Sequence, residues 1–67
     1  MIIVTIKPME LVKLTTMKGW NMQQLANHSG VSMATISRII GGKSCKAGTA
    51  VNIAKALETD FETLIIQ

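Results

Sequence analysis

Apolar residues recur every three or four positions along most of the chain, the spacing that places them on one face of an α-helix. The clearest example predicts a helix from about Ala47 to Glu58, whose inward positions are Ala50, Ile53, Ala54 and Leu57. A similar pattern predicts a helix from Pro8 to Lys18 with Leu11 and Leu14 inward. Proline suits the first turn of such a helix, and a glycine suits the position after its end.

Two shorter helices are predicted between these, joined by a tight turn. Asn21 is a suitable N-cap for a helix that ends near His28, and Ser32 for one that ends at a pair of glycines. Gly30 occupies the corner, where the backbone needs a left-handed or similarly permissive conformation. The two form a helix-turn-helix, whose inward residues are Leu25, Ala26, Val31, Ile36 and Ile39.

The remaining segments are shorter. Residues 1–7 are rich in β-branched side chains, which predicts a strand or an extended arm. Its two faces would carry Ile2, Val4 and Ile6 on one side and Ile3, Thr5 and Lys7 on the other. The stretch from Lys43 to Lys46 predicts a polar, basic loop. Asp60 is expected to cap a short last helix, whose apolar residues are Phe61, Leu64 and Ile65.

These elements predict an all-α fold, a compact bundle of five helices with a short extended amino-terminal arm or strand. Residues 1–7 would form the arm or strand, and residues 8–67 the helix-turn-helix domain. With 48% hydrophobic but 3% aromatic residues, the single core of this 67-residue chain is expected to be aliphatic. Met9 and Met17 are expected to fill it, whereas Met33 is expected to point outward. Trp20 is expected to pack on a residue one turn into the helix that it precedes.

Charge and chemistry narrow the function classes. Seven basic and four acidic residues give a net charge of +3, which suits a polyanionic partner. Cys45 has no second cysteine to bond, and one cysteine with one histidine cannot build a structural zinc site. We therefore expect a cytoplasmic protein with no metal and no cofactor, and an exposed thiol at Cys45 whose thiolate Lys43 and Lys46 would favour.

Neither enzymatic nor membrane chemistry is indicated. The carboxylates lie near predicted helix ends or outer faces, and no catalytic set or small-molecule site emerges from the pattern. The apolar stretch 1–6 is too short to span a membrane and has no basic leader, so no membrane contact is expected.

With these residues in view, the chain resembles the lambda-repressor-like family of phage and bacterial regulators, of the Cro and xenobiotic-response-element type. The resemblance covers Pro8 to Ile65 and is carried by GWNMQQLANHSGVSMATISRIIGGK and VNIAKALETDFETLI. It implies a five-helix lambda-repressor-like bundle that binds double-stranded operator DNA as a homodimer and regulates transcription as a phage- or mobile-element-type repressor. In that family the second helix of the motif lies in the major groove.

The resemblance also implies roles for individual residues. The residues that match base-reading positions of the family are Ser32, Met33, Ala34, Ser37 and Arg38. The residues that match phosphate-contacting positions are Asn21, Met22, Gln23, Thr35, Lys43, Ser44 and Lys46.

Several positions depart from the family's pattern. Met22 replaces a glutamine that often reaches a phosphate. Met33 and Ala34 replace amides that pair with adenine, which leaves contact with thymine methyl groups. Arg38 is then the best candidate for a bidentate contact to guanine. Thr15 and Ile40 stand where many relatives carry an arginine–glutamate pair, so we expect Ile40 to pack toward Thr15 and the amino-terminal arm.

Two alternatives stay open. The apolar outer residues of the third helix also fit an antitoxin or antirepressor-like module that binds another protein with the same fold. The dimer contact could come from the last helix, through Leu64, Ile65 and Ile66, or from strand pairing of the arm.

Overall fold

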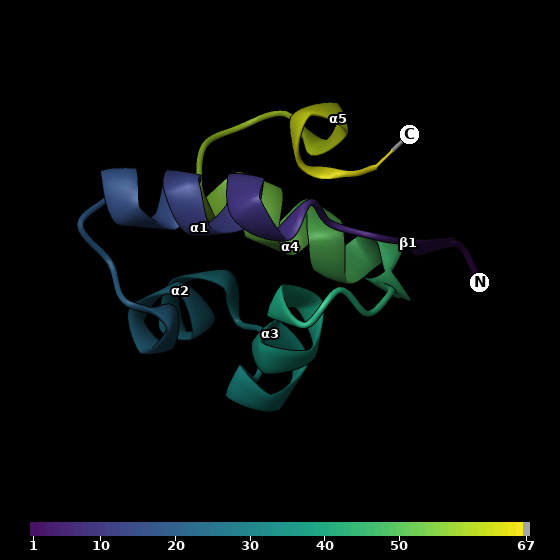
Figure 1. The fold of residues 1–67 in the computed structure, drawn as a ribbon, viewed down its shortest axis with the longest axis horizontal. Coiled ribbons are helices and arrows are strands. Elements are labelled where there is room, and N and C mark those ends of the chain that lie inside the picture. Colours follow the sequence, from purple (N-terminus) through teal and green to yellow (C-terminus); the bar gives the residue numbers. More distant parts are fainter. Residues whose placement is uncertain (67) are drawn as a thin grey trace.

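The computed structural model describes residues 1–66, which form five helices and one two-stranded sheet. In chain order these are β1 (Ile3–Val4), α1 (Pro8–Met17), α2 (Met22–Ser29), α3 (Met33–Ile40), β2 (Cys45–Lys46), α4 (Ala47–Ala56) and α5 (Phe61–Leu64). Helices α1 and α4 form a middle layer, with α5 on one side and α2 and α3 on the other (Figure 1). The predicted five-helix bundle is thus confirmed.

The core is aliphatic, as predicted. Its fully buried members include Leu11 of α1, Leu25 of α2, Ile53 of α4 and Leu64 of α5. The predicted inward face of α4 is buried at all four positions, Ala50, Ile53, Ala54 and Leu57. Thr15 is the buried polar residue of the described chain, and its hydroxyl donates a 2.7 Å hydrogen bond to the backbone oxygen of Leu11. Burial of this hydroxyl therefore leaves no polar group unpaired.

The helix-turn-helix has the predicted caps. The Asn21 side chain accepts from the Gln24 N–H, and the Gln24 side chain accepts from the Asn21 N–H, both at 2.8 Å, which makes a reciprocal capping box. Ser32 accepts from the Thr35 N–H at 3.2 Å and so caps α3. Gly30 ends α2 with φ +71°, a left-handed conformation that favours glycine. Gly30 and the Ser32 cap thus define the turn between α2 and α3.

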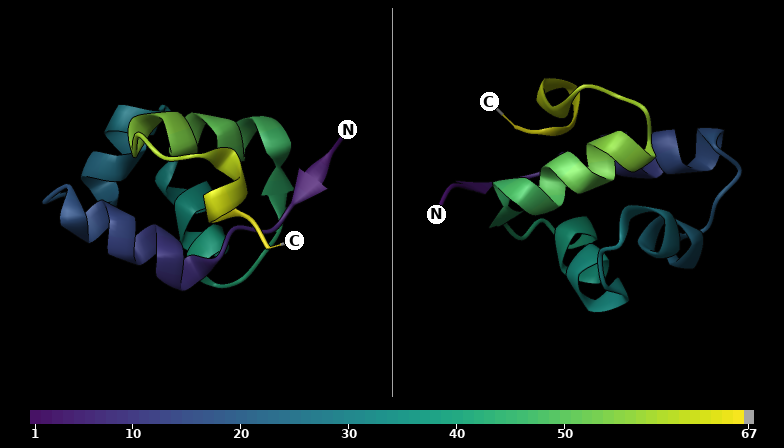
Figure 2. Two further views of the ribbon diagram at one scale, coloured as in Figure 1. Left: turned by 90° about the horizontal axis from the view of Figure 1, so that it is seen from above. Right: turned by 180° about the vertical axis from the view of Figure 1, so that it is seen from behind.

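The amino-terminal segment is a strand of the fold. Ile3 lies opposite Lys46 and Val4 opposite Cys45 in the antiparallel pair of β1 with β2. On its other edge, Ile6 forms an antiparallel bridge with Ile65, and Ile6 is completely buried. Figure 2 shows this segment passing between the body of the bundle and the end of α5. The segment therefore links β2 to the chain after α5.

Some predictions about single residues were wrong. Met9 and Met17 are 79% and 75% exposed, because Leu11 and Thr15 fill the inward face of α1. The basic loop ends at residue 44, since Cys45 and Lys46 pair with β1.

The aromatic packing at the α1–α2 turn also differs from the prediction. The Trp20 ring stacks on His28, near the far end of α2, with ring centroids 4.1 Å apart and planes 3° from parallel. The Lys18 ammonium lies 5.7 Å from the centre of the Trp20 ring. Ile40 is half-buried and packs against the core. Its packing toward Thr15 and the amino-terminal arm stays a prediction.

Glu58 follows α4 in an unusual backbone conformation. Its φ is +55°, in the left-handed region, where the Thr59 N–H donates to Ala54 and the Glu58 N–H to Lys55. These bonds close the carboxyl end of α4 as a Schellman motif, a position usually taken by glycine. The Glu58 carboxylate pairs with Lys18, and this hydrogen bond lowers the pKa of Glu58. The pairing links the turn after α1 to the end of α4.

Ile6→Ala is expected to lower the free energy of unfolding by about 2–5 kcal/mol, because it empties a fully buried site. Ile6→Val should cost about 0.5–1.5 kcal/mol. Urea unfolding followed by circular dichroism measures both. The matched control is Ile2→Ala, on the same face of the strand but 74% exposed, which should change stability by less than about 0.5 kcal/mol. Equal effects at the two positions would mean that the segment is not part of the core.

Glu58→Gly is expected to melt at a higher temperature than Glu58→Ala. Both changes remove the pairing with Lys18, but only glycine relieves the positive φ. The difference in melting temperature should be about 4–8 °C, as measured by calorimetry. An alanine variant as stable as the glycine variant would show that this backbone position is not strained.

Candidate DNA-binding surface

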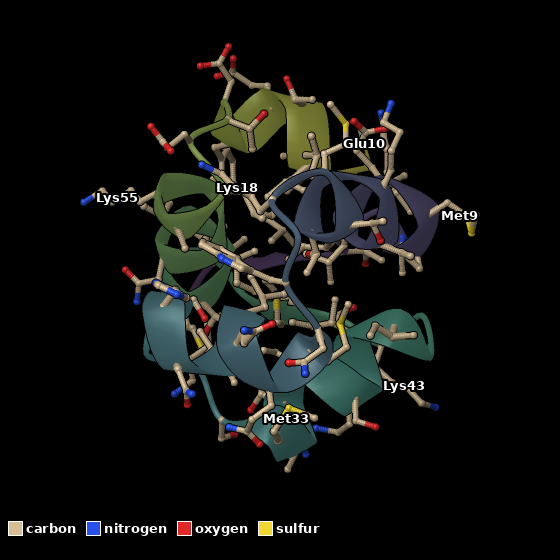
Figure 3. All side chains as sticks on the ribbon, turned by 90° about the vertical axis from the view of Figure 1, so that its left-hand side faces the viewer. Met9, Glu10, Lys18, Met33, Lys43 and Lys55 are labelled. Carbon is tan, nitrogen blue, oxygen red and sulfur yellow. The ribbon has the colours of Figure 1, made fainter. Side chains whose placement is uncertain are left out.

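The outer face of α3 and its N-cap carry all five residues predicted to contact bases. Ser32, Met33, Ala34, Ser37 and Arg38 are exposed. Beneath them, the inner face of the same helix is anchored by Ile36 and Ile39, which are completely buried. Met33 and Lys43 point outward on the side of the molecule that carries α2 and α3 (Figure 3). This face is therefore held rigidly while its side chains remain free to meet a partner.

The Ser32 hydroxyl already makes two hydrogen bonds within the first turn of α3. Its hydroxyl oxygen accepts from the Thr35 N–H, and its proton is donated to the Thr35 hydroxyl at 3.0 Å. The two hydroxyls thus form a small network at the start of α3. A further bond from Ser32 to a partner would have to share or replace one of these contacts.

The start of α2 offers two of its three predicted phosphate-contacting side chains. Asn21 and Gln23 are exposed, and the Gln23 amide donates to Asn27 at 3.1 Å along the outer face of the helix. Met22 is half-buried and packs against the core. The structure therefore does not support a side-chain contact from Met22, whose apolar side chain serves packing instead.

A groove beside α3 brings the other predicted phosphate-contacting residues together. The groove has a volume of about 530 Å³, and its lining includes Thr35, Arg38, Lys43, Ser44 and Lys46. In the described part of the chain, the ion pairs Lys13–Glu10 and Lys18–Glu58 do not involve any of its three cations. The groove is consequently a site of uncompensated positive charge next to the outer face of α3.

Sequence reasoning missed four further residues of the groove: Met1, Ile3, Cys45 and Thr49. Met1 and Ile3 reach it because β1 pairs with β2, directly after the basic loop. The alternation in residues 1–7 predicted a strand but gave no indication of its partner. Thr49 lies in the first turn of α4, which follows β2 directly.

Cys45 is not the exposed thiol that we expected. It is 9% exposed in β2, and burial raises the pKa of the Cys45 thiol. The neighbouring lysines therefore do not favour the thiolate as predicted, because desolvation of the charged form is the dominant effect.

Comparison with known families decides what this arrangement is. The family model of the Cro/C1-type helix-turn-helix DNA-binding domain matches residues 9–66. The chain belongs to this family. The match covers both helices of the motif and the groove, apart from Met1 and Ile3. A search of curated proteins found no match.

Solved structures share the fold of this Cro/C1-type domain. A mutant of hydroxyethylphosphonate dioxygenase superposes with a TM-score of 0.82 and 21% identity, and PhpD with cadmium and hydroethylphosphonate superposes with 0.80 and 19%. Each match covers 94% of this chain but 14% of the other chain. At this level of identity the likeness shows the fold alone. Within residues 1–66, no helix is long and apolar enough to cross a bilayer.

Cys45 is expected to react slowly with a small disulfide reagent. Because its pKa is raised, the folded protein keeps the proton to a higher pH than the unfolded chain, whose thiol titrates near about 8.5. Its contribution to stability is present below that pH and is lost as the pH rises through the folded pKa. At pH 8 the folded protein should react at least about tenfold more slowly than the same protein in urea. Equal rates would contradict the burial, and the single cysteine makes the signal unambiguous.

Proposed function

We propose that this Cro/C1-type domain is a sequence-specific transcriptional regulator that inserts α3 into the major groove of an operator. The observation that carries the proposal is the division of α3 into a buried face, with Ile36 and Ile39, and an exposed face with predicted base-contacting side chains. A helix presented in this way fits the major groove. The regulator would act as a cytoplasmic repressor of phage or mobile-element type, by occupying a promoter.

The base contacts are assigned to the outer face of α3. Met33 and Ala34 would contact thymine methyl groups, because their side chains carry no hydrogen-bonding group. Arg38 would donate two hydrogen bonds to one guanine, with Ser32 and Ser37 beside it. A bidentate pair of this kind contributes about 1–3 kcal/mol of discrimination against the wrong base.

The phosphate contacts flank that helix on both sides. Asn21 and Gln23 would act with the free N–H groups at the start of α2, where the helix dipole favours an anion. In the groove, Thr35 and Ser44 would donate hydroxyl hydrogen bonds, and Lys43 and Lys46 would supply charge. These contacts fix the register of the protein on the duplex but do not depend on base sequence.

A homodimer would extend the readout to two half-sites about 34–36 Å apart. The predicted contribution of Leu64 is excluded by its complete burial, and Ile65 is engaged by the bridge to Ile6. Of the last helix and its end, Ile66 stays 55% exposed and is the remaining candidate for this contact.

Selection of bound duplexes from a random pool, followed by titration at several salt concentrations, tests this proposal. The wild-type protein should select a consensus and lose affinity steeply as salt rises. Arg38→Ala should lose discrimination at one base pair by about 5- to 150-fold, equivalent to about 1–3 kcal/mol. Arg38→Lys should not restore it, since it keeps the charge without the fork.

The matched control is Lys55→Ala, which removes a cation from α4 on another side of the molecule (Figure 3). It should keep the same consensus and change affinity by less than about twofold. Unchanged discrimination in Arg38→Ala would show that the base contact is wrongly assigned. A partner protein bound with little salt dependence, and no duplex selected, would instead support an antitoxin or antirepressor-like module.

A further inference from the structure

We propose that the amino-terminal strand is part of the DNA-contacting surface, with Met1 and Ile3 forming an apolar wall against the deoxyribose groups of one DNA strand. This inference rests on the proposed function. It adds Met1, which precedes β1, and Ile3 of β1 to the DNA-contacting surface. Neither residue lies within the range matched by the family model, 9–66.

The groove beside α3 has two chemically different sides. Cations and hydroxyls from α3, the loop and α4 supply one, among them Thr35, Lys43 and Thr49. Met1 and Ile3 supply the other, and they are 91% and 55% exposed. A DNA strand also has two chemically different parts, because anionic phosphates are linked by largely apolar sugars. The charge and the apolar side chains of this groove therefore match one sugar–phosphate strand.

The Ile3 part of the wall is held in place before any ligand binds. Ile3 lies opposite Lys46 in the sheet, and residues opposite each other on neighbouring strands share a face, with Cβ atoms about 4.5–5.5 Å apart. The Thr5 and Ser44 hydroxyls form a hydrogen bond of 3.2 Å, which ties the strand to the basic loop. A cation and an isoleucine are thus presented side by side. A strand fixed in this way loses little conformational entropy on binding.

The alternation of the strand separates residues that enter the groove from those that do not. Met1 and Ile3 line the groove, whereas Ile2 does not, although it is 74% exposed. Successive side chains of a strand point to opposite faces, so Ile2 is directed away from the groove. Ile2 is therefore a control that differs from Ile3 by one position in the chain.

Methionine methyl resonances provide the first test on the unmodified protein. The sequence has five methionines, and only Met1 lines the groove. On addition of the selected duplex to protein carrying ¹³C-methyl methionine, Met33 should shift because it lies on α3, and Met1 should shift with it. Met9 and Met17 should stay unchanged, since they are exposed on α1, which lies in the middle layer and not with α3 (Figure 1). If Met33 shifts and Met1 does not, the proposed function stands and this inference is overturned.

Charge substitutions provide the second test. Ile3→Lys should steepen the slope of log affinity against log salt by about 0.9, the value for one added phosphate contact, and Ile3→Asp should weaken binding about tenfold or more. Ile2→Lys and Ile2→Asp should each change affinity by less than about twofold and leave the slope unchanged. Circular dichroism should show all four variants folded, because both positions are exposed.

The other outcomes distinguish failure of this inference from failure of the proposed function on which it rests. Equal effects at positions 2 and 3 would reflect net charge alone and overturn the groove contact. A changed oligomeric state in the Ile3 variants, measured by sedimentation with an unchanged salt slope, would make the strand a contact between copies and also overturn it. If wild-type protein binds no duplex in a salt-dependent way, the proposed function itself is wrong.

Discussion

The whole surface depends on the burial of Ile36 and Ile39 beneath α3. This helix has eight residues, and an isolated helix of that length is marginal in water even with favourable residues. Its order therefore comes from tertiary packing against α1 and α2, with the Ser32 cap and the left-handed Gly30 fixing where it begins. Because the inner face supplies that packing, the side chains of the outer face are not needed for stability and can contact a partner.

The small sheet adds a second constraint, on the segment that follows α3. Without β1, the residues from Lys43 to Lys46 would be a basic loop between two helices, as their composition suggests. Pairing of Val4 with Cys45 fixes the end of this loop, and the bridge from Ile6 to Ile65 anchors the strand to the end of the chain that the structure describes. The position of Lys46, one of the groove cations, is thus set by residues far away in the sequence.

This dependence explains which features could be predicted from the sequence. Caps and helical faces depend on residues three or four positions apart, so Asn21, Gly30 and Ser32 were correctly placed. The partner of β1 depends on contacts about forty residues apart, and the burial of Cys45 followed from that pairing. Met9 and Met17 were misplaced for a different reason: long apolar side chains satisfy a helical pattern equally well at a surface position. The groove was missed because its walls come from three separate segments.

The fold by itself does not determine the function. The same bundle superposes on a portion, 14%, of chains described as hydroxyethylphosphonate dioxygenase and PhpD, so it occurs within much longer chains. Residues that hold this fold together, such as Leu25 and Ile53, therefore say little about what the domain binds. The informative residues are those that the fold leaves uncompensated. Arg38, Lys43 and Lys46 converge on one groove, and the ion pairs Lys13–Glu10 and Lys18–Glu58 of the described chain do not involve them. Their unpaired charge beside an exposed helix is what indicates a polyanionic partner.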